Sequence, residues 1–168
     1  DGDIVAAAEE ERFSRKKHDP GFPAEAIRYC LAEASVSSHS LDAVAFYDKP
    51  ILKFSRILET YFETPPGGLR SFLTAIPVWG TKKLWTAYEV DRSLAELGIE
   101  MPEHLYFPAH HASHAASAFY PSPYETAAII TIDGVGEWAT STIGQGNGGR
   151  IEQLEEIRFP HSLGLLYS

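Results

Sequence analysis

Ala127-Ala-Ile-Ile-Thr-Ile132, followed directly by Asp133-Gly-Val-Gly136, decides the fold of this 168-residue chain. A short apolar and β-branched run of this kind predicts a strand buried in an α/β sheet. Open α/β sheets bind their ligands at the carboxyl ends of their strands, which is where Asp133 lies. Gly134 and Gly136 carry no Cβ, so their backbone amides can approach a phosphate closely, although a turn between strands could use the same glycines. The stretch therefore predicts an α/β fold with a ligand site at this strand end.

A histidine-rich motif, Pro108-Ala-His-His-Ala-Ser-His-Ala-Ala-Ser-Ala-Phe119, lies about one strand before this stretch. On a helix, His110 and His114 are one turn apart on one face, the geometry that two ligands need to hold one metal ion. Together with Asp133 they form a set that suits Fe(II), Mn(II) or Zn(II), with open positions for water or substrate. The alternative for the pair is a surface or packing role. His111 points roughly 100° away around the helix, which favours a supporting hydrogen bond, a substrate contact or a structural role.

The segment from Glu9 to His18 carries dense charge of both signs. One interpretation is a solvated surface. The other is a substrate-binding cluster, in which cations contact an anionic or polar substrate and a carboxylate receives a hydroxyl proton. The cations of this cluster are Arg12, Lys17 and His18, and its carboxylates are Glu11 and Glu10.

The remaining patterns alternate between strand and helix. Strands are predicted at Ile4–Ala8, Asp42–Tyr47, Leu105–Phe107, Thr126–Ile132, Ala139–Ile143 and Ile151–Arg158, and Gly144–Gly149 predicts a hairpin turn. Helices are predicted after Phe22-Pro23, over the histidine motif, and from Ile51 to about Gly98, where Thr64–Gly68 interrupts the pattern. The first strand, helix and second strand predict a βαβ unit with a right-handed crossover. The sheet as a whole is predicted to be mixed.

Composition excludes several classes of protein. A net charge of -9 argues against a nucleic-acid surface, which needs a basic footprint. The single cysteine, Cys30, excludes a disulfide framework and favours a reducing compartment. The sequence contains no run of 18 apolar residues, so no membrane span is predicted and we expect a cytoplasmic protein. Asp1-Gly-Asp3 is a hairpin-turn signal without a preceding strand, and Leu163–Ser168 is typical of a helix cut in its first turns, so we expect a part of a larger protein.

Several collinear motifs together resemble one family. They are Ala6-Ala-Ala-Glu-Glu-Glu-Arg-Phe-Ser-Arg-Lys-Lys-His-Asp19 with Phe22-Pro23, His110–Phe119, Ile132–Glu137, and Phe159-Pro-His-Ser-Leu-Gly-Leu-Leu-Tyr167. They are similar to the O-carbamoyltransferases of nodulation-factor and antibiotic biosynthesis, the nodulation-protein-U type. The resemblance covers nearly the whole chain, and the segment from 51 to 100 is its least diagnostic part. The stretch from Asp133 to Gly136 also resembles the second phosphate loop of actin, sugar kinases and Hsp70.

The resemblance implies an ATP-dependent transferase. Such enzymes move a carbamoyl group from carbamoyl phosphate, by way of a carbamoyl-adenylate, to a hydroxyl of a sugar, antibiotic or other natural product. It also implies an actin/Hsp70/sugar-kinase-like (ribonuclease H-like) α/β fold, with a mixed sheet, flanking helices and a helical insertion at about 51–100. This chain would be the first half of that duplicated fold, truncated at both ends, and part of an N-terminal metal- and nucleotide-binding domain.

The resemblance assigns roles to single residues. His110, His114 and Asp133 would bind a divalent metal, iron first and manganese or zinc as alternatives, that holds and polarises the carbamoyl-adenylate. Contacts to the nucleotide and substrate are expected from Asp133, Gly134, Gly136, Arg12 and Lys17. The general base stays open between His111, His18 and Glu11, or a residue outside this chain.

Two other functions and several partners follow from the same motifs. One alternative is a kinase or ATPase of the same fold that uses Asp133-Gly-Val-Gly136 for phosphate and keeps its histidines for structure. The other is a non-catalytic binding lobe. For a carbamoyltransferase, the partners are carbamoyl phosphate, a hydroxyl-bearing acceptor, and the second actin-like half and adenylate-forming C-terminal domain of the parent chain. A homodimer through the helical segment is a further expectation, and the chain alone is expected to be inactive.

Overall fold

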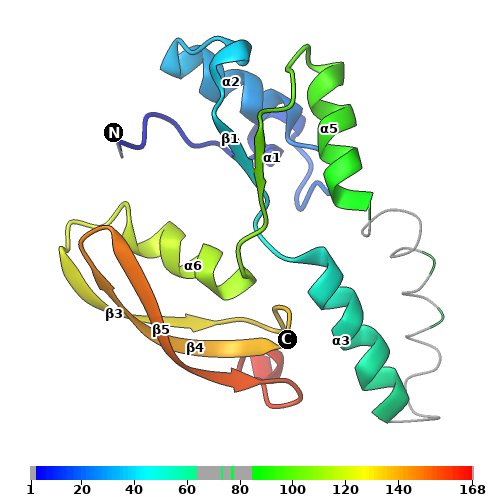
Figure 1. Cartoon of the computed structure of the whole chain (residues 1–168), viewed down its shortest axis with the longest axis vertical. Helices are drawn as coiled ribbons and strands as arrows, with labels where there is room; N and C mark the ends of the chain where they lie inside the picture. Colours follow the sequence, from blue (N-terminus) through cyan, green and yellow to red (C-terminus); the bar gives the residue numbers. More distant parts are fainter. Residues whose placement is uncertain (1–2, 64–72, 74–76, 78–84, 168) are drawn as a thin grey trace. The chain divides into compact units, whose positions relative to one another are not determined.

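The computed structural model describes residues 3–63, 73, 77 and 85–167 of the chain. They form two compact units, one of residues 1–44 and 87–105 and the other of residues 45–86 and 106–168. Figure 1 shows the elements, which are α1 (Glu11–Ser14), α2 (Ala24–Ala34), η1 (Ser38–Ser40), β1 (Ala43–Ala45), α3 (Pro50–Glu63), α5 (Thr86–Glu96), β2 (His104–Tyr106), α6 (His110–Phe119), β3 (Thr126–Ile132), β4 (Ala139–Asn147), β5 (Arg150–Arg158) and η3 (Gly164–Tyr167). None of the described helices combines the length and apolar character that crossing a membrane requires.

The first unit contains α1, α2 and α5, and most of β1 and β2, which pair with each other. The predicted strand at Ile4–Ala8 is wrong, because these residues belong to neither sheet. Ile4 and Val5 are 62% and 64% exposed. A strand needs a neighbour that completes its hydrogen-bond ladder, and no described strand lies there to pair with this segment. The predicted βαβ unit is therefore wrong as well.

The second unit is built on an antiparallel sheet of order β3-β4-β5, with α6 packed on one face (Figure 1). The core between helix and sheet contains Ala115 and Phe119 of α6 and Ile129 of β3. The bounds predicted for β3 are confirmed, but the prediction that the strand is buried is wrong for one of its faces, because Ile130 and Ile132 are 67% and 58% exposed. Among the described elements, α6 covers only the face that Ile129 occupies.

The turn between β4 and β5 is shorter than predicted. β4 continues to Asn147, so only Gly148 and Gly149 connect the two strands. Gly148 has φ +55°, which suits a two-residue hairpin turn. The predicted single mixed sheet is also wrong, since the described strands form a two-stranded and a three-stranded sheet.

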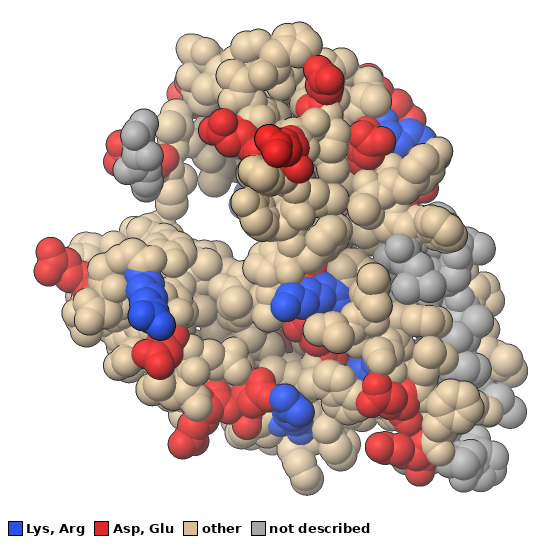
Figure 2. All heavy atoms as spheres, in the orientation of Figure 1, with Lys and Arg blue, Asp and Glu red and all other residues tan. Residues whose placement is uncertain are grey.

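The α/β class and most helices are confirmed. α2, α3, α5 and α6 lie where helices were predicted, and the predicted helix at the end of the chain is the short 3-10 helix η3. The two helices of the proposed insertion, α3 and α5, belong to different compact units. The predicted interruption at Thr64–Gly68 lies outside the described residues. On the face drawn in Figure 2, Lys and Arg of the described residues form no continuous patch.

Candidate metal centre

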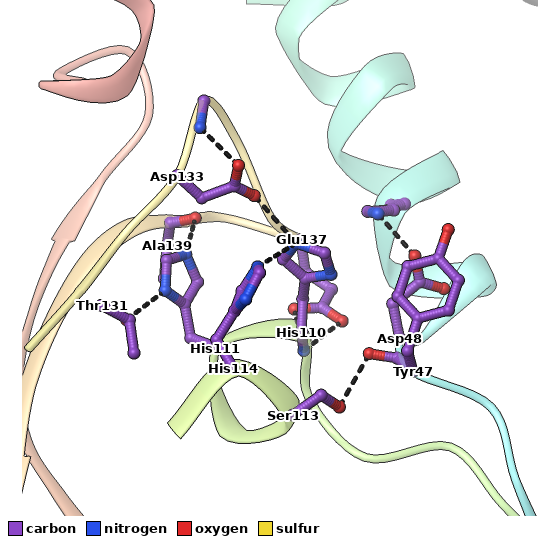
Figure 3. A network of polar contacts seen from close by, with 12 residues as sticks. Tyr47, Asp48, His110, His111, Ser113, His114, Thr131, Asp133, Glu137 and Ala139 are labelled. Carbon is purple, nitrogen blue, oxygen red and sulfur yellow. Dashed lines mark hydrogen bonds and ion pairs between the residues drawn. The ribbon is translucent and has the colours of Figure 1, made fainter. Parts of the chain in front are cut away.

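Two histidines and one aspartate converge at the start of α6. His110 is the first residue of this helix, His114 follows one turn later, and Asp133 directly follows β3. The Nε2 atom of His110 lies 2.8 Å from Asp133 Oδ2 and 3.1 Å from His114 Nε2 (Figure 3). One ligand atom from each residue lies within 4.8 Å of the others. The helix start and the strand end thus bring together the three residues that the sequence predicts as metal ligands.

The loop after β3 orients the Asp133 carboxylate. The Gly134 N–H donates to Oδ1 at 2.7 Å, which leaves Oδ2 directed at His110. The Asp133 N–H donates to Thr140 O, and the Gly136 N–H donates to Ala139 O, both at 2.9 Å. The amides predicted to meet a phosphate are therefore engaged within the loop in this structure.

Gly136 has a second role, which is to let α6 approach the loop. A Cβ atom at this position would lie 3.0 Å from the His111 ring, 3.1 Å from Ala139 O and 3.3 Å from His110 Cβ. These separations are tighter than ordinary van der Waals contact. The glycine therefore permits the close contact between the helix start and the strand-end loop.

The pKa shifts of Asp133 and His114 suit metal binding. Burial raises the pKa of Asp133, but the Gly134 hydrogen bond and the contact with His110 outweigh it, so the net pKa is lowered and the carboxylate is ionised at neutral pH. Burial and then the charge of His110 lower the pKa of His114, which favours the neutral imidazole that metal binding requires. Two ligand atoms that each lie about 2.1 Å from one ion, with a right angle between their bonds to it, are about 3 Å apart. The two shortest separations in the cluster match this spacing.

The segment directly before α3, residues 47–49, lies beside His110 and forms one side of the site. The Tyr47 ring meets the His110 ring edge-on at 5.7 Å, and Ser113 Oγ of α6 donates to Tyr47 O at 2.8 Å. Lys53 donates to the buried Asp48 carboxylate at 2.5 Å and lies 5.6 Å from the centre of the Tyr47 ring (Figure 3). The segment and α3 thus place an aromatic ring and an ion pair next to His110.

Sequence reasoning missed Glu137, which is 7% exposed and completes this arrangement. Its carboxylate accepts from the His110 N–H at 3.0 Å and 3.1 Å and from the Lys49 N–H at 2.9 Å. The only signal in the sequence is its place directly after the Asp133–Gly136 loop. A carboxylate that binds backbone amides 27 and 88 residues away leaves no pattern of paired side chains to find.

His111 is 2% exposed and uses both ring nitrogens in hydrogen bonds. Nε2 lies 2.9 Å from Ala139 O, and since a carbonyl only accepts, Nε2 carries the proton. Nδ1 lies 2.5 Å from Thr131 Oγ1, which in turn lies 2.7 Å from Thr142 Oγ1. Of the three roles open to His111, this geometry favours a structural one that joins α6 to β3 and β4.

The charged residues near the N-terminus belong to the other compact unit. Glu10 accepts from the Ala26 N–H at 2.9 Å and thereby stabilises the start of α2, where Pro23 supplies no side-chain cap. Glu11 accepts from the His18 N–H at 3.0 Å. Arg12 is exposed beside Glu9, 3.7 Å away, and Lys17 is exposed. The contribution of Glu11, Arg12, Lys17 and His18 to substrate binding stays a prediction.

A turn after β5 packs on the peptide that carries Asp133. Ser162 Oγ donates to Gly134 O at 2.7 Å and lies 3.3 Å from Asp133 O. A Cβ atom at Gly164 would lie only 2.2 Å from Asp133 O. Ser162 and Gly164 therefore support the peptide that carries Asp133.

Comparison with known proteins gives one family and several relatives. A family model described as the N-terminus of carbamoyltransferases matches residues 1–168. The protein sll1178 of Synechocystis is 52% identical over 172 residues, which cover all of this chain and 28% of that protein. Nodulation protein NolNO of Sinorhizobium fredii is 34% identical over a region that covers 99% of this chain and 23% of that protein. Nodulation protein NolO of Bradyrhizobium diazoefficiens is 40% identical over a region that covers 34% of this chain and 11% of that protein. The chain spans about a quarter of the first two relatives.

Proposed function

Since the chain belongs to the family of carbamoyltransferase N-terminal domains, we propose that it carries the metal centre of an ATP-dependent O-carbamoyltransferase. The reaction moves a carbamoyl group from carbamoyl phosphate, through carbamoyl-adenylate, to a hydroxyl of a sugar, antibiotic or other natural product. The observation that carries this proposal is the convergence of His110 Nε2, His114 Nε2 and Asp133 Oδ2 in a chain of this family.

The three ligands are suited to a divalent ion of borderline character, with iron as our first assignment and manganese or zinc as alternatives. When bound, the ion supplies a Lewis acid that polarises the carbonyl of the carbamoyl group. His110 and His114 offer Nε2 atoms on one side, and Asp133 offers an oxygen that the Gly134 amide has already oriented. The side chains therefore need little rearrangement to hold the ion.

In the transfer step, the acceptor oxygen attacks the carbamoyl carbon, the bond from that carbon to the AMP phosphate oxygen breaks, and AMP leaves with the bonding electrons. The acceptor hydroxyl must give its proton to a base. His111 is a weak candidate, because both of its ring nitrogens are already used. Glu11 and His18 remain our candidates within this chain, and Arg12 and Lys17 are proposed to contact the anionic substrate.

The rest of the activity is proposed to come from parts that this chain does not contain. We propose an actin-like duplicated fold whose second half, together with a C-terminal domain that forms the adenylate, completes a cytoplasmic enzyme. A phosphate-binding loop without a metal has less support, because Gly134 and Gly136 already donate their amides within the loop. A purely structural lobe would gain nothing from an ionised carboxylate beside two imidazoles.

Metal content of the full-length protein tests the proposal. Elemental analysis is made on the wild type, on a His110→Ala/His114→Ala double variant, and on a His39→Ala control whose side chain is exposed. We expect a near-stoichiometric divalent metal in the wild type and the control, and its loss in the double variant with folded content unchanged. Carbamoyl transfer to a panel of sugar and natural-product alcohols should be lost with it. Unchanged transfer by the double variant would contradict the proposal.

A further inference from the structure

The start of α6 depends on a carboxylate from another part of the chain. The first amides of a helix have no partner within the helix and are normally satisfied by a polar N-cap side chain. Here the N-cap residue is Ala109, which makes no side-chain cap. Glu137 takes its place by accepting from the His110 N–H with both oxygens (Figure 3). A negative charge at this end of a helix is also favoured by the helix dipole.

The His110 ring has few other anchors. A metal-binding histidine usually donates its second ring nitrogen to a carboxylate, carbonyl or water, which fixes the orientation of the ring. The Nδ1 atom of His110 is buried and has no hydrogen-bond partner within the described part of the chain. Among the described residues, its Nε2 atom makes polar contacts to Asp133 and His114, and the Tyr47 ring meets the imidazole ring edge-on. The backbone of His110 is therefore the point at which its position is set.

The Glu137 carboxylate also holds the segment of residues 47–49, which forms one side of the site. Glu137 Oε1 accepts from the Lys49 N–H as well as from the His110 N–H. Lys49 is adjacent to Asp48, the partner of Lys53, and one residue beyond that lies Tyr47, which contacts His110. One oxygen atom thus joins the segment before α3 to the helix that carries two of the proposed ligands.

We propose that Glu137 is the positioning residue of the metal centre, and this inference rests on the metal site proposed above. Its carboxylate clamps the start of α6 to the segment before α3 and thereby holds His110 Nε2 against Asp133 Oδ2. Glu137 is not a ligand, because its oxygens are directed at backbone amides. Its reach and its acceptor oxygen carry the effect, more than its charge.

Two conservative substitutions separate reach from charge. Glu137→Gln keeps the side-chain length and one carbonyl oxygen, the atom that can accept from both amides. It removes the charge and replaces the second oxygen, which also accepts from the His110 N–H, by an NH2 group. Glu137→Asp keeps the charge but is one methylene shorter, so it cannot reach both amides. Glu155→Gln and Glu155→Asp are matched controls, because Glu155 is exposed on β5.

The first measurement is Co2+ affinity of the full-length protein, followed by the visible absorption of the bound ion, with thermal unfolding as a check on folding. We expect Glu137→Asp to weaken Co2+ binding by about tenfold or more and to change the absorption bands, as is typical of lost supporting contacts. Glu137→Gln should weaken binding clearly less than Glu137→Asp, and both Glu155 controls should stay close to the wild type. Equal weakening in the Gln and Asp variants, or weakening in neither, would overturn the proposal.

The second measurement needs no metal, so it distinguishes failure of this inference from failure of the metal site. Hydrogen exchange is followed by mass spectrometry in metal-free protein, on peptides that cover the start of α6. Exchange there should accelerate clearly more in Glu137→Asp than in Glu137→Gln. That result in a protein that binds no Co2+ would refute the proposed metal centre and leave the clamp in place. Equal exchange in wild type and Glu137→Asp would refute the clamp itself.

Discussion

Gly164→Ala is expected to damage the proposed metal centre without replacing any of its ligands. In the structure a Cβ atom at Gly164 would lie 2.2 Å from Asp133 O, 2.3 Å from the Asp133 carbonyl carbon and 2.7 Å from Gly134 N. All three are backbone atoms, so no side chain can rotate away from the methyl group. Non-bonded carbon atoms pack at about 3.5–4.0 Å, so the two segments must separate by roughly 1 Å.

Two effects of opposite sign determine how much Gly164→Ala changes the free energy of unfolding. Alanine restricts the unfolded chain more than glycine and stabilises by about 0.5–1 kcal/mol where it fits. Forcing a methylene-sized group into a packed contact costs about 1–3 kcal/mol. The net change should therefore destabilise the protein by about 1–2 kcal/mol. Because the displaced peptide carries Asp133, its 2.8 Å contact with His110 should also be lost, and Co2+ affinity should fall by about tenfold.

The assay compares Gly164→Ala with Gly149→Ala in the full-length protein, by thermal unfolding and by Co2+ titration. Gly149 lies in the β4–β5 turn, and a Cβ atom there would meet nothing within 4 Å. This control should change stability by less than about 0.5 kcal/mol. Gly164→Ala should lower the midpoint of the transition in which these 168 residues unfold by about 3–6 °C. A Gly164→Ala variant with wild-type midpoint and wild-type Co2+ affinity would refute the argument.

Three further substitutions or conditions test the site. His114→Ala should abolish metal binding and carbamoyl transfer in the full-length protein, and transfer at the wild-type rate would contradict its role as a ligand. His111→Ala should destabilise by about 2–4 kcal/mol, since it leaves a buried cavity and unpaired polar groups; loss of activity at unchanged stability, measured by denaturation, would instead indicate a catalytic role. Metal affinity should fall as the pH falls, because protons compete for the imidazoles. Burial and the charge of His110 lower the pKa of His114 below its ordinary 6.5, so this proposed ligand should become protonated only below that pH. A series of Co2+ titrations in which the loss of affinity is centred above pH 7 would contradict this.

The sequence predicts β3 and α6 well because their determinants are local. The apolar and β-branched run from Thr126 to Ile132 and the histidine motif each form the element expected of them. The end of β4 was missed because its glycines are typical of a turn. Their role is tertiary: a Cβ at Gly146 would lie 2.4 Å from the Phe119 ring, and one at Gly144 would lie 2.5 Å from Glu152 O. Close approach by a ring or a neighbouring strand leaves the same glycine signature as a turn.

The candidate ligands could be found from sequence because chemistry and spacing both point to them. His110 and His114 are one helical turn apart, and Asp133 ends an apolar strand. The residues that hold these ligands in place could not be found in this way. Glu137 acts on backbone amides, which every residue possesses, so no complementary side chain marks its partners.

The proposed metal centre therefore depends on two kinds of residue. The proposed ligands provide donor atoms at a helix start and a strand end, but neither element alone sets the distance between them. Besides Glu137, that distance depends on the absence of a side chain at Gly136, which admits α6, and at Gly164, which supports the Asp133 peptide. A relative that keeps both histidines and the aspartate but carries a larger residue at the position of Gly164 should bind metal poorly. When metal binding is inferred from the sequence of a member of this family, the residues at the positions of Gly136 and Gly164 should therefore be checked as well as the ligands.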